Sequence, residues 1–275
     1  MINFLHTFQP SAILFSYGPI TIYWYGFFMV LAILTALALS FWMAKLYGIP
    51  RETVFDLAFW LIIGGLLGAR IYDDLLQLPY YLQHPLQIFS VWNGGLAIHG
   101  ALIAGWLVAW FFAKRRGISF WRLVALIAPG LALGQAIGRW GNYFNQEIFG
   151  LPTAWVWGIP IEAANRPLQY ISNQYFHPTF LYESLGCLLI SAILVIFNVY
   201  RLKNGRQERY FDILAVALYV ILYSILRFSL EFIRLDPTPL WLGLRWPQAV
   251  SLSLIVTAIL LISFKHHERE KNSQG

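Results

Sequence analysis

The feature that most constrains this chain is the number of apolar stretches long enough to cross a lipid bilayer. A membrane-spanning helix needs about 20 mostly apolar residues, and about seven such stretches lie between charged or Pro/Gly-rich breaks. Only 12% of the residues are charged, against roughly a quarter in a soluble domain. We therefore predict an all-α membrane protein with a single domain over 1–275. The predicted spans are 20–44, 53–71, 91–113, 122–140, 179–200, 211–233 and 247–264.

The basic residues predict how the chain crosses the membrane. Thirteen of the 19 Lys and Arg residues lie at one set of loop ends, from Lys45 to Lys271 along the chain. Positive charge stays on the cytoplasmic face, which predicts an N-terminus outside the cytoplasm and a C-terminus inside. Residues 141–178 then form an extracytoplasmic loop, and 265–275 form a cytoplasmic tail. Because topology explains the net charge of +6, we expect no nucleic-acid partner.

Ionisable groups inside the apolar spans are the first candidates for function. Each costs on the order of 2.5–3.5 kcal/mol near the bilayer centre on insertion scales. The span 211–233 carries a stripe of polar residues at helical spacing: Tyr219, Tyr223, Arg227, Glu231 and Arg234. Arg227 and Glu231 are four residues apart and are predicted to pair, either for function or as a structural lock between helices. Arg234 and Arg245 lie near span ends, where snorkelling to the interface is expected.

A glycine-rich segment at the end of the fourth span predicts an anion site. Gly138 to Gly150 reads G-R-W-G-N-Y-F-N-Q-E-I-F-G and includes Arg139, Asn142 and Glu147. An arginine fork binds phosphate through two parallel hydrogen bonds. We therefore expect this segment to bind an anion near the outer membrane surface.

His99 is the one histidine inside the predicted spans, and it lies about two turns below the outer end of the third span. A helical histidine is often a satisfied core residue. Here the other spans supply polar groups at similar depth, which favours a catalytic or ligand role. The chain shows no metal-ligand spacing and no nucleotide-binding glycine motif, so we expect no metal or organic cofactor. Cys187, the single cysteine, is interpreted as a packing residue.

Small residues at every fourth position predict close helix packing. Gly130, Gly134 and Gly138 have this spacing in the fourth span, and Gly64 and Gly68 have it in the second.

Taken together, these motifs resemble the bacterial phosphatidylglycerol–prolipoprotein diacylglyceryl transferases. The Gly138–Gly150 segment is similar to the family signature, although Gln146 stands where many members have glycine. The resemblance covers most of the chain, through residues 23–26, 68–72, 92–100, 138–150, 177–183 and 227–234. It implies transfer of diacylglycerol from phosphatidylglycerol to the lipobox cysteine of a prolipoprotein signal peptide. It also implies a place in the bacterial inner membrane, among membrane lipids.

The resemblance assigns roles to individual residues. Arg139 matches the arginine that binds phosphatidylglycerol, and further important positions are matched by Tyr25, His99, Asn142, Glu147, Tyr223, Arg227 and Glu231. A cysteine thiol has a pKa of about 8.5, so a base such as His99 would help to form the attacking thiolate. Arg139 and Arg227 would stabilise the leaving phosphate. Glu231 would orient Arg227, while Asn142 and Tyr25 would position the lipid.

Two other functions compete with this hypothesis. A transporter of an anionic metabolite could use the same arginines, although transporters often contain inverted repeats and none is recognisable here. An intramembrane protease would need a serine or paired-aspartate motif, which the chain lacks.

Overall fold

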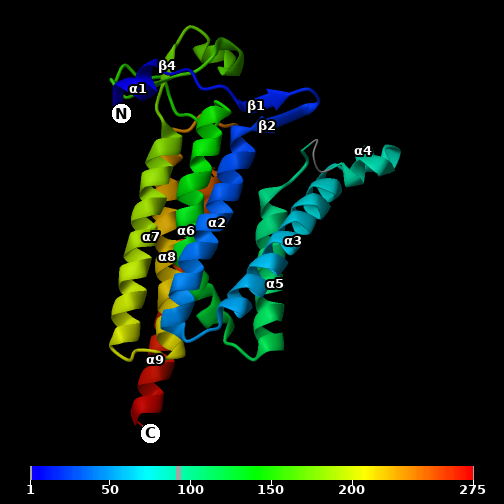
Figure 1. Cartoon of the computed structure of the whole chain (residues 1–275). Coiled ribbons are helices and arrows are strands. Elements are labelled where there is room, and N and C mark those ends of the chain that lie inside the picture. The colour runs from blue at the N-terminus through cyan, green and yellow to red at the C-terminus, as the bar shows by residue number, and fades with distance from the viewer. Residues whose placement is uncertain (1, 91–93, 275) are drawn as a thin grey trace. The chain divides into compact units, whose positions relative to one another are not determined.

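The computed structural model describes residues 2–90 and 94–274, and 71% of the chain is helical. Within these residues, six helices are long and apolar enough to cross a membrane. They are α2 (Trp24–Tyr47), α3 (Arg51–Leu76), α6 (Phe120–Phe144), α7 (Thr179–Lys203), α8 (Arg209–Leu230) and α9 (Trp246–Gln274) (Figure 1). The predicted class, an all-α membrane protein, is confirmed.

The third predicted span, 91–113, corresponds to a shorter helix, α5 (Ile98–Arg116). This helix is not among the six, since its last three residues are all basic. Gly94–Ala97 are not helical, so the predicted start was too early. Val91, Trp92 and Asn93 lie outside the described residues.

Other predicted boundaries also differ from the structure. The second and fourth spans continue to Leu76 and Phe144, beyond the predicted ends at 71 and 140. The first span does not begin at residue 20, because Ile20–Tyr23 form strand β2, which pairs antiparallel with β1 (Ile13–Tyr17). The sixth span ends at Leu230 rather than at 233. The tail beyond 264 continues α9 as a helix, where Lys265 pairs with Glu268 at 2.5 Å across one turn.

The chain divides into two compact units, residues 1–39 with 127–275, and residues 40–126. The single domain over 1–275 stays a prediction. In the first unit α8 packs against both α7 and α9, and the chain termini lie at opposite ends of these helices (Figure 1). The second unit is built on the pairing of α3 with α5 and also contains α4 (Leu78–Gln83) and the short helix η1 (Pro85–Phe89).

Close packing at small residues is confirmed in both units. On α6, a Cβ added to Gly134 would lie 3.3 Å from the backbone oxygen of Ala32 on α2. On α3, Gly68 lies directly against the backbone of Gly100 on α5. Gly138 differs, because a Cβ there would have open space around it. Gly134 and Gly68 therefore allow two helices to approach closely, and Gly138 has no such role.

The predicted loop 141–178 forms a compact cap at one end of the first unit. It begins at the last turn of α6 and contains β3 (Ile159–Pro160), η3 (Ala163–Asn165), η4 (Leu168–Tyr170) and β4 (Tyr175–Phe176). Strands β3 and β4 pair antiparallel, and α1 (Ile2–Thr7) packs against β3. An apolar cluster joins the cap to α6 and α7 through Leu5, Tyr143, Phe149, Ile159, Ile161, Phe176 and Phe180.

Candidate active site

Arg139, near the end of α6, lies in a network of buried polar groups. Its Nη2 is 2.7 Å from Oε1 of Glu183 on α7, and its Nη1 donates to Oδ1 of Asn142 at 3.1 Å. Arg139 keeps 22% of its side chain exposed, whereas Glu183 keeps 1%. Glu183 therefore contacts the guanidinium of Arg139 from the buried side, while another part of the Arg139 side chain stays exposed.

The signature segment continues this network toward the surface. Asn142 donates from Nδ2 to Oε1 of Glu147 at 2.7 Å, and Asn145 approaches the same oxygen at 3.4 Å. Asn142 thus accepts from a cation and donates to an anion, which uses both ends of its amide. Arg139, Asn142 and Glu147 therefore lie in one network, while their roles stay predictions.

Gln146, the departure from the family pattern, has a backbone conformation that favours glycine. Its φ is +50°, in the left-handed region that costs a residue with a Cβ about 1–2 kcal/mol. Its buried side chain donates to the oxygen of Pro10 at 2.9 Å and accepts from the N–H of Glu162 at 2.7 Å. These two bonds connect the signature loop to the N-terminal segment and to the cap.

Helix α8 adds the polar stripe predicted from its spacing. Tyr223 donates to Oε1 of Glu183 at 3.1 Å, and Tyr219 donates to Gln135 on α6 at 3.0 Å. Nη1 of Arg227 is 2.5 Å from Oε2 of Glu231, which confirms the predicted pair. The stripe therefore faces protein rather than lipid at these positions.

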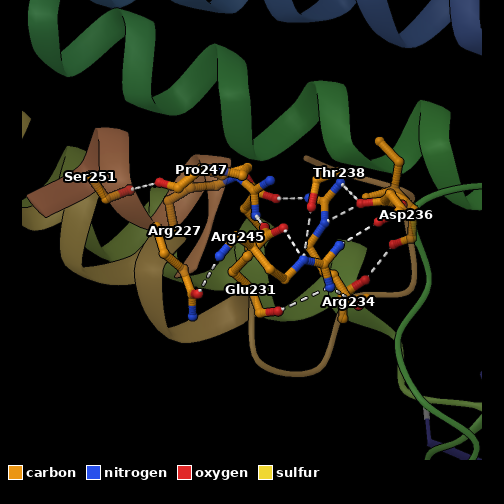
Figure 2. Close-up of polar contacts among 12 residues, drawn as sticks. Arg227, Glu231, Arg234, Asp236, Thr238, Arg245, Pro247 and Ser251 are labelled. Carbon is orange, nitrogen blue, oxygen red and sulfur yellow. Dashed lines mark hydrogen bonds and ion pairs between the residues drawn. The ribbon is translucent and has the colours of Figure 1, made fainter. Parts of the chain in front are cut away.

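Arg234 and Arg245, whose place near span ends weakened the inference of function, both make ion pairs within the protein (Figure 2). Arg234 is 7% exposed; its Nη1 lies 3.4 Å from Oε2 of Glu183, and its Nε donates to Asp236 at 2.6 Å. Nε of Arg245 lies 2.9 Å from Oε1 of Glu231. Because α8 ends at Leu230, the chain turns back and brings both arginines against buried carboxylates; Arg234 is buried, whereas Arg245 keeps 23% of its side chain exposed. The helical spacing that placed Arg234 on the stripe does not apply beyond that point.

Glu183 is the residue that the sequence analysis missed. It binds Arg139 and Arg234 through separate oxygens and also accepts from Tyr223. The sequence contains a signal for Glu183, because it is the one carboxylate in the 25 residues of α7. A charge inside an apolar span is costly unless it is paired.

The four arginines of this cluster differ in how many donors they have left. Arg234 and Arg245 have contacts at Nε and at both Nη atoms. Arg227 has an ion pair at Nη1, while its Nε and Nη2 make no hydrogen bond within the described residues. With their direct ion-pair partners Glu183, Glu231 and Asp236, the four cations leave a formal charge of +1; Glu147, which reaches Arg139 through Asn142, is not counted in this sum. The cluster can therefore accept an anion, and Arg227 offers the most unused donors.

Tyr25 lies near the signature segment. It stands at the beginning of α2, and a Cβ added to Gly141 would come within 3.0 Å of its ring. The glycine therefore lets the tyrosine approach the end of α6.

His99 belongs to the second unit, where it is the second residue of α5. Its ring is exposed on this unit and lies 6.0 Å from that of Tyr72 on α3. Arg70 holds the segment before the helix by donating to the oxygens of Ile88 at 2.8 Å and Gly94 at 3.0 Å. The approach of His99 to the arginines of the first unit stays a prediction.

No group of three or more His, Cys, Asp or Glu residues in the described parts of the chain could hold a metal ion. The expectation that no cofactor is needed stays a prediction. Cys187 is fully buried, as a packing residue would be. The neighbouring Ser184 donates to the backbone oxygen of Ala136 at 2.7 Å.

Comparison with known proteins shows the family of this chain. The family profile described as prolipoprotein diacylglyceryl transferase matches residues 12–264. The chain belongs to the prolipoprotein diacylglyceryl transferase family.

Relatives of this family match nearly the whole chain. A phosphatidylglycerol–prolipoprotein diacylglyceryl transferase of Nostoc sp. is 44% identical over 257 residues, which are 93% of this chain and 89% of the relative. The protein of the same name from Synechocystis sp. is 43% identical over 92% of this chain and 89% of its own. That of Halalkalibacterium halodurans is 39% identical over 89% and 82%. The predicted family and enzyme class, a transferase, are confirmed.

Proposed function

We propose that the chain transfers the diacylglyceryl group of phosphatidylglycerol to the lipobox cysteine of a prolipoprotein. In this reaction a sulfur–carbon bond forms at the glycerol carbon, and the bond from that carbon to the phosphate oxygen breaks. The thiol proton passes to a base, and glycerol phosphate leaves with the bonding electrons. The observation that carries the proposal is a partly open arginine cluster with excess positive charge in a helical membrane protein of this family.

Arg139 and Arg227 have the chemistry to bind the phosphate and to stabilise it as it leaves. Both are partly exposed, at 22% and 17% of their side chains, and both are anchored by carboxylates that are almost completely buried. A fixed cation in a site of low dielectric acts on developing charge without reorganising. Removal of one such contact reduces kcat by about 10²–10³.

The other predicted site residues have supporting roles in this proposal. Asn142 and Glu147 extend the polar network from Arg139, and Tyr223 fixes Glu183 from α8. Tyr25 positions the lipid next to Gly141. His99 deprotonates the incoming thiol.

The proposal also sets the orientation of the chain. The lipobox of a signal peptide is reached from the outer face of the bacterial inner membrane, where the signature segment and the cap would lie. The N-terminus is then extracytoplasmic and the C-terminus is cytoplasmic, as the basic loop residues predict. Within the first unit, the termini lie at opposite ends of the helices (Figure 1).

The test is incubation of the purified protein with phosphatidylglycerol and a lipobox peptide, followed by mass spectrometry of the peptide. The expected result is a gain of one diacylglyceryl group by the native protein and no gain with Arg139→Ala. A peptide with serine in place of its cysteine is the control and should stay unmodified. An unchanged peptide together with glycerol phosphate flux into proteoliposomes would instead support the transporter.

The role of His99 has its own test. His99→Gln removes the base and should reduce kcat strongly, because the thiol is then mostly protonated at neutral pH. If His99→Gln and His99→Ala turn over at rates close to the native rate, His99 is not the base.

A further inference from the structure

Arg245, which directly precedes α9, uses every nitrogen of its guanidinium in contacts with the protein. Its Nε lies 2.9 Å from Oε1 of Glu231 and donates to Oγ1 of Thr238 at 3.0 Å. Its Nη atoms donate to the backbone oxygens of Glu231, Arg234 and Asp236 (Figure 2). No nitrogen of this guanidinium is left without a partner, so Arg245 is poorly suited to bind a substrate directly.

A short hairpin aims Arg245 at Glu231. Strands β5 (Leu240–Trp241) and β6 (Leu244–Arg245) pair antiparallel and are joined by Leu242 and Gly243, both with positive φ, at +50° and +80°. Two such residues match the twist of the strands they join. The backbone N–H of Arg245 donates to Oε1 of Gln248 at 3.1 Å. The hairpin and the first turn of α9 both fix the backbone of Arg245. Its side chain therefore extends back to the end of α8.

The charges around Glu231 show what this contact changes. Glu231 is completely buried and lies between Arg227 and Arg245. A pair of Arg227 with Glu231 alone would be neutral, whereas the three groups together carry +1. The neighbouring set of Arg139, Arg234, Glu183 and Asp236 has no net charge. The excess positive charge of the whole cluster therefore depends on Arg245.

We propose that Arg245 is a positioning residue that shares Glu231 with Arg227 and so leaves Arg227 effectively cationic toward phosphate. The inference rests on the proposed function and deepens it. Arg245 does not touch the substrate. It fixes Glu231 by an ion pair, fixes the chain after α8 by carbonyl contacts, and lets Arg227 present its free Nε and Nη2.

A purely structural role would involve only the carbonyl contacts, so the two roles can be separated by substitution. Arg245→Lys keeps the charge and loses the planar fork. Arg245→Gln loses the charge. The matched control is Arg166, which donates to the backbone oxygens of Ile161 at 2.7 Å and Ile171 at 2.9 Å and has no carboxylate partner among the described residues.

The experiment measures the thermal unfolding midpoint, binding of glycerol phosphate, and kcat and KM with phosphatidylglycerol. Arg245→Gln should weaken glycerol phosphate binding and lower kcat, each by about 10- to 100-fold, the effect of one charge-assisted contact. Arg245→Lys should stay within about threefold of the native protein in both, because the Coulombic term persists. Arg166→Gln should lower the unfolding midpoint and leave kcat of the folded protein unchanged.

Equal binding and kcat for Arg245→Lys and Arg245→Gln, or unchanged values with a lower unfolding midpoint, would overturn the inference. If Arg245→Gln does not fold, a tenfold loss of glycerol phosphate binding in Arg245→Lys would also overturn it. A native protein that binds glycerol phosphate but transfers no diacylglycerol refutes the proposed function alone, because the binding measurement still tests Arg245.

Discussion

Oε1 of Glu183 lies 2.7 Å from Nη2 of Arg139, and its other oxygen lies 3.4 Å from Arg234. One buried carboxylate therefore joins two arginines that are far apart in the sequence. Glu231 does the same for Arg227 and Arg245. In each set one arginine keeps an Nε without a hydrogen bond among the described residues, and the other has a protein contact at every guanidinium nitrogen.

The Glu183 contact predicts a large loss of stability on removal of its charge. Glu183→Gln leaves the buried guanidinium of Arg234 and the partly exposed one of Arg139 with less counter-charge, which costs about 3–5 kcal/mol. The thermal unfolding midpoint in detergent should fall by about 10 °C. Glu268→Gln is the control, since that carboxylate is 51% exposed and has Lys265 as its one ion-pair partner in the described part of the chain. Its effect should stay below about 1 kcal/mol. Equal midpoints for the two variants would contradict the shared-anion arrangement.

The free donors of Arg227 predict that a lysine cannot replace it. Arg227→Lys can keep the ion pair with Glu231 but cannot offer two further parallel N–H groups to phosphate. We expect kcat to fall by about 10- to 100-fold, as for the loss of one charge-assisted hydrogen bond, measured by diacylglyceryl transfer to a lipobox peptide. Arg269→Lys, at an exposed pair with Glu208, should be indistinguishable from native. Full activity of Arg227→Lys would remove the bidentate contact from the mechanism.

The conformation of Gln146 predicts an unusual order of stability. Gln146→Ala keeps the positive φ and deprives Pro10 and Glu162 of their partners, which costs about 1–3 kcal/mol for a buried group left unsatisfied. Gln146→Gly loses the same bonds but relieves about 1–2 kcal/mol of backbone strain. The order of unfolding midpoints should therefore be native, then Gln146→Gly, then Gln146→Ala. A less stable glycine variant than alanine variant would rule out the strain.

His177 predicts a loss of stability in mild acid. Burial lowers the pKa of His177 below its ordinary value of 6.5, and its Nδ1 is within 3.1 Å of the Tyr182 hydroxyl. Between the folded and unfolded pKa values the unfolded chain binds more protons, so stability falls as pH drops below about 6.5. The unfolding midpoint of the native protein should fall more between pH 7 and about 5 than that of His177→Gln. His267→Gln, at an exposed position, should follow the native curve.

Local patterns in the sequence were enough to predict the helices and the pair on α8. Arg227 lies in the last turn of α8, and Glu231 follows directly as its C-cap with helical backbone angles, so their contact depends on local helical geometry. The polar residues of the signature are similarly close in sequence, and Asn142 links Arg139 to Glu147 within nine residues. Family resemblance supplied the roles that geometry does not.

Contacts that depend on tertiary structure could not be predicted in this way. Glu183 meets Arg139 across 44 residues, and no local period relates them. Arg245 looked like an interfacial residue because sequence distance from a span end does not show that the chain turns back. Similarly, Ile20 and Ile22 are as apolar as the helix that follows, so hydropathy could not separate strand β2 from α2.

The burial of Cys187 has a consequence for a protein that alkylates thiols. It is the single cysteine of the chain, and its side chain is completely enclosed between helices. An enzyme with an accessible sulfur close to its own lipid donor would risk attaching that lipid to itself. With this thiol enclosed, the protein has no nucleophilic sulfur of its own to compete with the incoming peptide, so it is protected from self-modification.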